Sequence, residues 1–236
     1  MNNIEICFSP LSYPLYKNNN SVVVVIDVFR ATSAICAAIH FGVKNIIPVA
    51  EMEEAIHYKK SGYIVAAERD GMVVEGFDMG NSPFSYLEEK LLNQQVVLTT
   101  TNGTKALKAA RDAYKVVVGA FVNFSALKEF LMKENKNVIF LCAGWKDRYN
   151  LEDSLFAGAV AKELLENKNF QTTCDATISS IKLYELAKDN INDFLAVSSH
   201  RNRLAKLNLE KDINYCLTKD LAPVVPIFED NVIKKL

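Results

Sequence analysis

The chain has 236 residues, of which 27 are lysine or arginine and 28 are aspartate or glutamate, so its formal net charge at pH 7 is −1. This balance gives no global argument for binding nucleic acid or a membrane surface, and no apolar run approaches the roughly 18 residues that span a bilayer. The N-terminal residues lack a signal-peptide pattern, and the five cysteines are far apart, which favours reduced thiols. We therefore expect a cytoplasmic protein that binds neither nucleic acid nor membrane. Its length suits one compact α/β unit, or two closely packed lobes of about residues 1–120 and 121–236.

Residues 22–33 read VVVVIDVFRATS and predict the centre of the fold. The run of β-branched residues is typical of a strand buried on both faces, as found in mostly parallel sheets. Asp27 and Arg30 follow the carboxyl end of this strand, and Thr32 or Ser33 is expected to cap the next helix. Because ligands of open α/β sheets bind at this edge, one interpretation is a site for an anion and a metal. The other is an Asp–Arg pair that only closes the turn.

Strands and helices alternate through the first 145 residues, which predicts a layered α/β/α fold with mostly parallel buried strands. Further strands are expected at residues 4–8, 45–49, 63–67, 95–99, 115–119 and 137–143. Helices are expected at residues 51–60, 83–92 and 124–134 and from Thr104 onward. Residues 68–83 contain three glycines and no helical period, so we expect a loop there, with a hairpin near residues 72–75 and Ser82 as the cap of the following helix.

The C-terminal part is expected to be rich in helix. Helices are predicted over residues 151–165 and most of 176–207, with a break near 190–193. Short strands are predicted at 213–217 and 224–228, the latter at a sheet edge because Pro223 and Pro226 lack an N–H group. The functional site should then lie at the carboxyl ends of the strands, between the two packed lobes.

Familiar nucleotide-binding and phosphatase motifs are absent or incomplete. The chain has neither the G-x-G-x-x-G nor the G-x-x-x-x-G-K-[ST] motif, which disfavours dinucleotide and triphosphate binding. The D-x-D pattern of haloacid dehalogenases fails at Phe29, which replaces the second acid of that motif. Cys142 and Arg148 match the C-x₅-R spacing of cysteine phosphatases, so a thiolate mechanism stays open as an alternative.

Acidic residues and two polar turns provide a different constellation. Carboxylate oxygens are the ligands that Mg²⁺ prefers, usually one or two from the protein, and the candidates near strand ends are Asp27, Glu68, Glu152 and Asp153. The segments GNSPF and TTNGT precede expected helices, where amides, hydroxyls and backbone N–H groups can surround a phosphate. Their candidate residues are Asn81, Ser82, Thr101, Asn102, Gly103 and Thr104. Taken one at a time, the acids also fit structural roles, as first-turn acids of a helix or as partners in ion pairs. The three histidines are interpreted as structural or solvated, although His200 or Arg201 could reach an anionic substrate.

Four blocks in fixed order carry a resemblance to a known family. IDVFRATS, GFDMGNSP, TTNGTKAL and CAGWKDRYNLEDSLFAGA, together with SSHRNRL and DINYCL near the C-terminus, resemble the 2-phosphosulfolactate phosphatase family over essentially the whole chain. The resemblance implies a Mg²⁺-dependent enzyme that hydrolyses (2R)-2-phospho-3-sulfolactate to 3-sulfolactate and phosphate. In methanogens this step lies on the route to coenzyme M.

Most of the candidate residues fall in these blocks, and their individual roles are our own inference from their chemistry. Asp27, Arg30 and Glu68 would be catalytic, and Asp27, Glu68, Glu152 and Asp153 would hold Mg²⁺. Because the substrate is strongly anionic, cations must gather at the site, and Arg148, Arg201 and Lys105 are candidates beside Arg30. Thr32, Ser33, Asn81, Ser82 and residues 101–104 would complete substrate binding. A homodimer is the assembly considered, and a non-catalytic sensor of a phosphorylated or sulfonated metabolite is the alternative to an enzyme.

Overall fold

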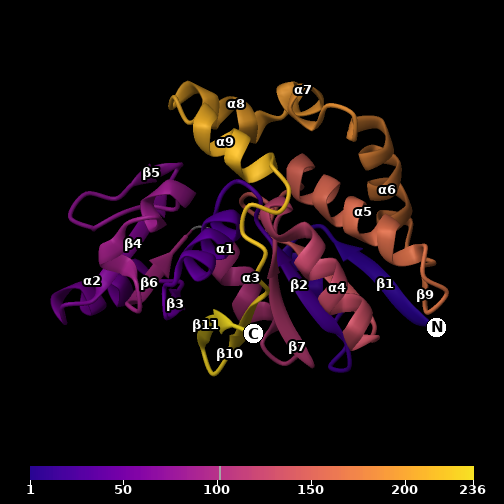
Figure 1. Ribbon diagram of the computed structural model, residues 1–236, viewed down its shortest axis with the longest axis horizontal. Coiled ribbons are helices and arrows are strands. Elements are labelled where there is room, and N and C mark those ends of the chain that lie inside the picture. Colours follow the sequence, from indigo (N-terminus) through magenta and orange to yellow (C-terminus); the bar gives the residue numbers. More distant parts are fainter. Residues whose placement is uncertain (101) are drawn as a thin grey trace.

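The computed structural model describes residues 1–100 and 102–236, so the expectation for Thr101 lies outside the described residues. Within them the chain forms an eleven-stranded, mostly parallel sheet with helices around it (Figure 1). This confirms the predicted α/β class. The strands are β1 Asn2–Cys7, β2 Val22–Ile26, β3 Asn45–Val49, β4 Ile64–Arg69, β5 Met72–Val73, β6 Gln95–Thr99, β7 Lys115–Gly119, β8 Val138–Cys142, β9 Phe170–Gln171, β10 Pro226–Glu229 and β11 Val232–Lys235. The α-helices are α1 Ala31–Phe41, α2 Met52–Lys60, α3 Gly103–Ala110, α4 Phe124–Glu134, α5 Leu151–Leu165, α6 Asp175–Ala187, α7 Ile191–Phe194, α8 Ser199–Lys206 and α9 Glu210–Leu217.

Strand β2 is an interior strand of the sheet with a parallel neighbour on each side, as its composition predicts. It pairs in parallel with β7 on one side and β8 on the other, and all five of its side chains are fully buried. Side chains of a strand alternate between its two faces. Val22, Val24 and Ile26 therefore join a core with α4 and α5, while Val23 and Val25 join a second core with α1 and α3.

The sheet order is β5-β4-β6-β3-β11-β10-β7-β2-β8-β1-β9. Strands β4, β6 and β3 form one parallel block, and β7, β2, β8, β1 and β9 form the other. The C-terminal hairpin β10–β11 lies between the two blocks and pairs antiparallel with β7 and β3. The last residues of the chain therefore join the two parts of the sheet.

The prediction of an edge strand at residues 224–228 is wrong in position. Strand β10 is interior, and Pro226 is tolerated because it is the first residue of the strand and because the pairs with β7 use Ile227 and Phe228. The prediction of a strand at residues 213–217 is also wrong, since these residues belong to helix α9. Ile213 and Cys216 are buried three residues apart, which is a helical spacing.

The helix expected over residues 83–92 is replaced by two 3₁₀ turns, Pro83–Tyr86 and Glu89–Leu91. Tyr86 and Leu91 are both fully buried. Five residues apart, they would lie about 140° apart around a regular α-helix, so one helix could not bury both against the same surface. A hairpin is present close to the expected position, but it turns at Asp70 and Gly71, and residues 72–73 form its second strand, β5, which pairs antiparallel with β4.

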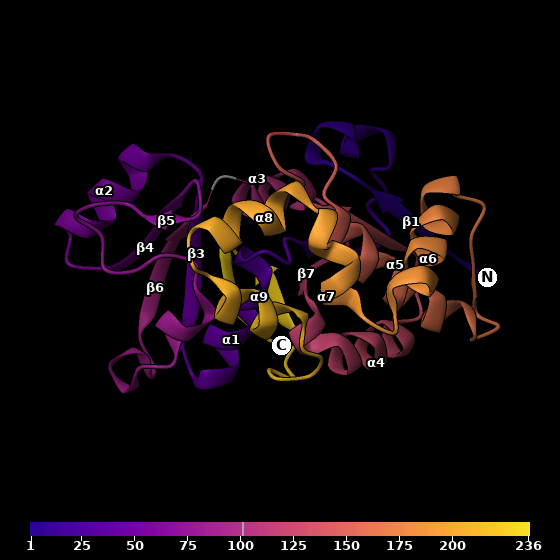
Figure 2. The same ribbon diagram turned by 90° about the horizontal axis from the view of Figure 1, so that it is seen from above.

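The C-terminal helices α8 and α9 lie over the sheet region where strand ends meet, as Figures 1 and 2 show from two directions. They are reached through α6 and α7, which follow the long helix α5. No helix in residues 1–100 or 102–236 combines the length and apolar character needed to cross a membrane.

Candidate active site

A cleft opens where four strands end beneath helix α8. Asp27 follows β2, Glu68 is the last residue but one of β4, Thr100 follows β6 and Trp145 follows β8. Parallel strands bring their carboxyl ends to one edge of a sheet, which is where such folds bind ligands. The cleft is lined by Asp27, Phe29, Arg30, Glu68, Asp70, Gly71, Asn81, Thr100, Asn102, Trp145, His200, Arg203 and Leu204.

Asp27 is held at the base of this cleft by the turn that begins helix α1. Its backbone N–H donates to Thr32 Oγ1 at 3.0 Å, and Ser33 Oγ donates to the Val28 carbonyl at 2.9 Å. The predicted cap residues therefore fasten the turn, and helix α1 begins earlier, at Ala31. Neither hydroxyl lines the cleft, so their expected contact with substrate has no support in this geometry.

The Asp27 carboxylate is only 6% exposed, and no side chain among the described residues hydrogen-bonds to it. Burial, together with Glu68 and Glu152 and against the opposing effect of His200, raises the pKa of Asp27 to about 7. A β-carbon on Gly103 would lie 3.2 Å from Asp27 Oδ2 and 3.4 Å from Thr100 Oγ1. Glycine at this position thus leaves room for the carboxylate at the start of α3.

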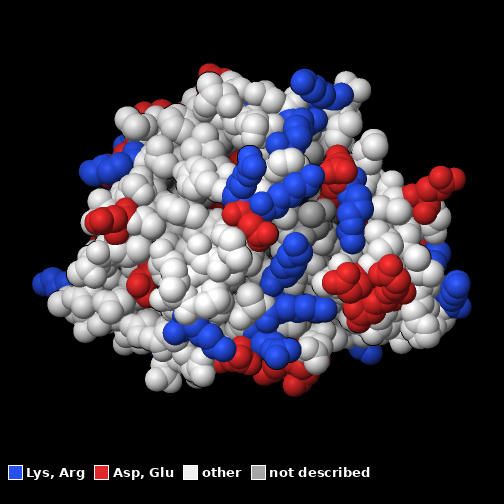
Figure 3. Space-filling view, turned by 180° about the vertical axis from the view of Figure 1, so that it is seen from behind, with Lys and Arg blue, Asp and Glu red and all other residues white. Residues whose placement is uncertain are grey.

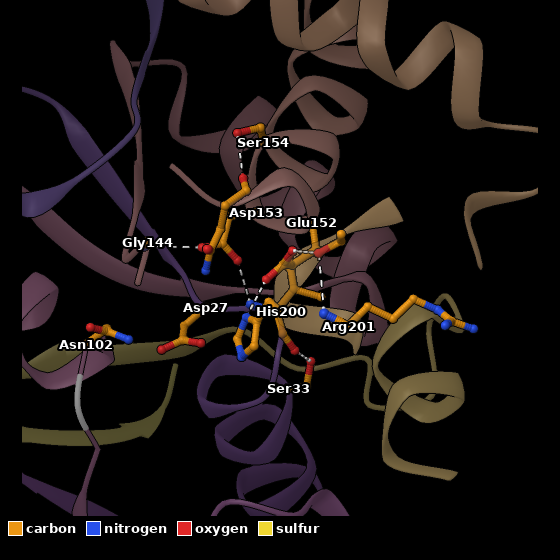
Figure 4. A network of polar contacts seen from close by, with 12 residues as sticks. Asp27, Ser33, Asn102, Gly144, Glu152, Asp153, Ser154, His200 and Arg201 are labelled. Carbon is orange, nitrogen blue, oxygen red and sulfur yellow. Dashed lines mark hydrogen bonds and ion pairs between the residues drawn. The ribbon is translucent and has the colours of Figure 1, made fainter. Parts of the chain in front are cut away.

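Glu152 and Asp153 begin helix α5 and are fully buried, but both are committed to protein partners (Figure 4). Asp153 accepts hydrogen bonds from the backbone N–H groups of Val28 at 2.9 Å and Gly144 at 3.3 Å. It thereby ties the loop after β2 to the loop after β8. Glu152 accepts from Ser198 and contacts His200. Neither residue lines the cleft. In this structure both support neighbouring segments of the chain, and their role as metal ligands stays a prediction.

His200 is the main functional candidate that the sequence had suggested was structural or solvated. Its Nδ1 lies 2.7 Å from Glu152 Oε1, and its ring packs edge-on against Phe29 with centroids 5.9 Å apart. Figure 4 shows the other side of the ring toward Asp27. A carboxylate on one ring nitrogen orients the imidazole and leaves the second nitrogen for proton transfer.

Glu68 and Asn81 form the opposite wall of the cleft. Glu68 accepts the backbone N–H of Gly71 and, more weakly, the Asn81 amide at 3.5 Å. The Oδ1 atom of Asn81 is buried and has no hydrogen-bond partner among the described residues, and the same is true of Thr100 Oγ1 and Arg203 Nη2. All three atoms belong to residues that line the cleft. Buried polar groups are normally satisfied, so this concentration points to a ligand that is bound in the working protein.

Arg30 is anchored within the protein rather than held loosely at the cleft. Its Nη1 donates to Asp212 of α9 at 2.6 Å, and its Nη2 donates to the Gly71 carbonyl. Ser82 Oγ also donates to Asp212, at 3.1 Å, and does not line the cleft. The guanidinium has five N–H donors, so Arg30 retains donors for a phosphate while it clamps α9 to the strand ends.

The remaining predicted residues divide between cleft and periphery. Asn102 lines the cleft, and its Oδ1 accepts from the Lys146 backbone N–H at 3.2 Å. Thr104 Oγ1 donates to the Thr100 carbonyl and is buried away from the cleft. Arg148 is exposed outside the cleft. Arg201 extends away from Asp27 (Figure 4), and its Nε donates to Asn192 Oδ1 at 3.0 Å.

The cysteine mechanism has no geometric support. Cys142 is fully buried and does not line the cleft. Burial, with Asp153 nearby, raises the pKa of its thiol well above the ordinary value, whereas a nucleophilic cysteine needs a lowered pKa. The side chain of Arg148, the expected phosphate ligand, is at the surface.

Arg203 and Trp145 were also missed by sequence reasoning. His200 and Arg203 are three residues apart, which places them on the same face of α8. The single tryptophan follows directly on a buried strand. Both signals are readable in the sequence, but the first required knowing that α8 faces the cleft.

The residues present fit a magnesium ion in part. Among the described residues, no group of three histidine, cysteine, aspartate or glutamate side chains is arranged to hold a metal by itself. Mg²⁺, however, usually takes one or two protein carboxylates and fills its other positions with water and substrate phosphate. Asp27, with Glu68 and the unpartnered oxygens of Asn81 and Thr100, supplies such a set of oxygen donors.

The surface near the cleft is positively charged although the whole chain is not. Helix α3 and the loop between β8 and α5 lie on the same side of the molecule (Figure 2), and that side carries a band of lysine and arginine (Figure 3). Exposed cations on these two elements include Lys105, Lys108, Lys146 and Arg148. Such a concentration raises the local density of anionic solutes.

The fold and the cleft define an α/β enzyme whose acids, amides and arginines meet at the carboxyl ends of parallel strands. A family model described as 2-phosphosulpholactate phosphatase matches residues 7–231. The chain belongs to the 2-phosphosulfolactate phosphatase family, which confirms the predicted enzyme class, a phosphoric monoester hydrolase.

Relatives from three bacteria carry the name "Probable 2-phosphosulfolactate phosphatase". The protein from Caldanaerobacter subterraneus subsp. tengcongensis is 38% identical over 216 residues, covering 90% of this chain and 89% of its own length. The protein from Thermotoga petrophila is 39% identical over 209 residues, with 89% of each chain covered. The protein from Caldicellulosiruptor saccharolyticus is 38% identical over 224 residues, covering 92% of this chain and 93% of its own.

Proposed function

We propose that the protein hydrolyses (2R)-2-phospho-3-sulfolactate to 3-sulfolactate and phosphate, with Mg²⁺ as its cofactor. Family membership over residues 7–231 supports the substrate. The observation that best supports the metal is Asp27, a buried carboxylate in the cleft without a side-chain partner among the described residues. A role of this step in coenzyme M biosynthesis, a cytoplasmic location and a homodimer stay predictions.

The proposed roles of the cleft residues follow from their contacts. Asp27 would hold the metal, with Glu68 as the second carboxylate. Mg²⁺, when bound, supplies charge neutralisation at the phosphate and lowers the pKa of a bound water. The donors that Arg30 retains would bind phosphate oxygens, where charge builds up in the transition state.

His200 would act as the proton donor to the departing oxygen. The leaving group is the hydroxyl of 3-sulfolactate, a poor leaving group unless it is protonated, and a positioned general acid typically contributes about 10²- to 10⁴-fold. Glu152 holds the ring by its Nδ1 edge, and Phe29 limits its rotation. The proton would therefore pass from Nε2.

The test measures phosphate release from 2-phospho-3-sulfolactate. We expect turnover with Mg²⁺, loss of turnover in EDTA and recovery when Mg²⁺ is restored. Asp27→Asn should lower kcat/KM by about 10²- to 10³-fold, on the scale of other electrostatic catalytic groups. Asp78→Asn is the matched control, because Asp78 lies outside the cleft, where it contacts Lys59 and the Val65 N–H.

Two results would count against the proposal. Turnover that persists in EDTA would show that the reaction needs no metal. Near-normal kcat/KM in Asp27→Asn would show that Asp27 has no part in the mechanism. Tight binding of phosphosulfolactate with no phosphate release would instead identify a sensor.

A further inference from the structure

Two arginines line the cleft, and their contacts differ. Arg30 already donates hydrogen bonds to Asp212 and to the Gly71 carbonyl. Arg203 makes no ion pair with a carboxylate of the described residues, and its buried Nη2 has no hydrogen-bond partner among them. Burying a guanidinium donor without a hydrogen-bond partner costs free energy. The simplest explanation is that a bound ligand supplies the acceptor for Arg203.

Arg203 is nevertheless held in place by an aromatic ring. Its guanidinium carbon lies 4.0 Å from the ring centroid of Trp145, and Lys146 Nζ lies 4.5 Å from the same centroid. Trp145 is positioned by a tight turn in which its backbone N–H and carbonyl pair with Arg148 at 3.0 and 3.1 Å. Stacking on an aromatic face orients a guanidinium without using its N–H donors. The edge of the Arg203 fork thus remains available to an anion.

The chemistry of this arrangement suits one particular anionic group of the proposed substrate, on whose identity the inference rests. The phosphate belongs beside Asp27 and the metal donors, and the carboxylate is a good ligand for Mg²⁺. A sulfonate is a weakly basic anion with three acceptor oxygens, which matches the weakly hydrated, planar guanidinium better than it matches a hard cation.

We propose that Arg203, oriented by Trp145, binds the sulfonate of 2-phospho-3-sulfolactate and so selects this substrate from other 2-phosphohydroxy acids. Arg203 is a specificity-determining residue in this assignment, and Trp145 is a positioning residue that acts through it. Lys146, on the same ring, adds positive charge at the mouth of the subsite.

The experiment compares two esters that differ only in the sulfonate, namely 2-phospho-3-sulfolactate and 2-phospholactate, in the Mg²⁺-loaded protein. Arg203→Met should lower kcat/KM for the sulfonated ester by about 100-fold, the scale of lost charge-assisted hydrogen bonds. It should change kcat/KM for 2-phospholactate by less than about threefold, because that ester makes no such contact. Trp145→Leu should show the same selectivity with a loss of about tenfold, mainly in KM. Lys206→Met, an exposed residue of the same helix, is the matched control and should leave both esters unchanged.

Equal losses for both esters would overturn the assignment, since Arg203 would then bind the phosphate or carboxylate. Wild-type kcat/KM for both esters in Arg203→Met would overturn it as well. Calorimetric binding of 3-sulfolactate separates this inference from the proposed function. If the wild-type protein hydrolyses neither ester, the phosphatase proposal fails, while weaker 3-sulfolactate binding by at least tenfold in Arg203→Met would still support the subsite. Equal dissociation constants for the two proteins would reject it.

Discussion

At the scale of single residues, Asp27 combines nearly complete burial with a carboxylate that must be charged to hold a metal. Its pKa is raised to about 7 by burial, and burial and the neighbouring acids Glu152 and Asp27 also raise the pKa of Asp153 well above its ordinary value. The folded protein without metal therefore binds protons at these groups more tightly than the unfolded chain, in which aspartate has a pKa near 3.9. Stability contributed by a raised carboxyl pKa is present at low pH and is lost as pH rises from the unfolded value to the folded one.

This predicts opposite effects of pH with and without metal. In EDTA, Asp27 should make the protein less stable as pH rises from about 4 to about 7, by at most roughly 1.4 kcal/mol per pH unit. Because Mg²⁺ competes with the proton, its stabilisation should be larger at pH 8 than at pH 5. Urea unfolding over this pH range checks both trends. An Asp27→Asn variant with the wild-type pH dependence in EDTA would contradict the assignment to Asp27.

His200 provides the second prediction at this scale. If it donates a proton to the leaving oxygen, His200→Gln should lower kcat for 2-phospho-3-sulfolactate by about 10²-fold or more. Glu152→Gln should lower kcat less, because the imidazole loses its orienting carboxylate but stays in the cleft. An aryl phosphate ester, whose leaving group needs no proton, should be slowed far less by either change. Equal slowing of both esters in steady-state assays would indicate a binding role instead.

At the scale of elements, helices α5 and α6 approach unusually closely at one glycine. A β-carbon on Gly158 would lie 2.2 Å from the Ser180 carbonyl oxygen and 2.4 Å from its carbon. These atoms are backbone and cannot turn aside as a flexible side chain could. The absence of a side chain at residue 158 thus sets the separation of two helices, and α5 carries Glu152 and Asp153 at its first turn.

Gly158→Ala should therefore destabilise the protein although alanine favours helix. Overpacking typically costs about 1–3 kcal/mol, which corresponds to a fall in Tm of roughly 2–12 °C for a chain of this size. Differential scanning calorimetry measures the change. Ala176→Gly is a useful comparison, because it loosens α6 at a half-buried position without forcing the helices apart. An unchanged or higher Tm in Gly158→Ala would show that α5 and α6 can separate at little cost.

At the scale of the whole molecule, the C-terminal hairpin joins the two parallel blocks of the sheet. Ile233 of β11 is fully buried and pairs with Ile46 of β3, while β10 pairs with β7. The blocks that carry Glu68 and Asp27 are therefore connected through the last strands of the chain. Their connection holds the two walls of the cleft together.

We expect Ile233→Ala to destabilise the whole protein by about 2–5 kcal/mol, as for other large-to-small changes in a core. Unfolding in urea should keep a single transition with a lower midpoint, since both blocks share the hairpin. Val232→Ala, a half-buried neighbour, should cost less. Two separate transitions in the wild-type protein would show that the blocks unfold independently.

Much of the architecture could be predicted because its signals are local. The valine run of β2, the helices beginning at Phe124 and Leu151, and the acids after β2 and at the end of β4 are read from short stretches of sequence. The interior position of β10 could not be predicted from the sequence. A proline such as Pro226 is typical of an edge strand, and only the tertiary structure shows which strands pair with β10. Helix α9 was mistaken for a strand because the segment is short enough for either period to fit.

The sequence by itself determined which strands are buried and which polar residues stand at their carboxyl ends, since both follow from side-chain periodicity and strand length. Only the tertiary structure decided how these residues are used. Asp27 faces the cleft, whereas Asp153 accepts hydrogen bonds from two backbone N–H groups. His200 and Arg203 reach the cleft from a helix more than 170 positions later in the chain. A carboxylate or a guanidinium is available to a ligand only if no other part of the protein satisfies it, and that depends on contacts between residues far apart in sequence.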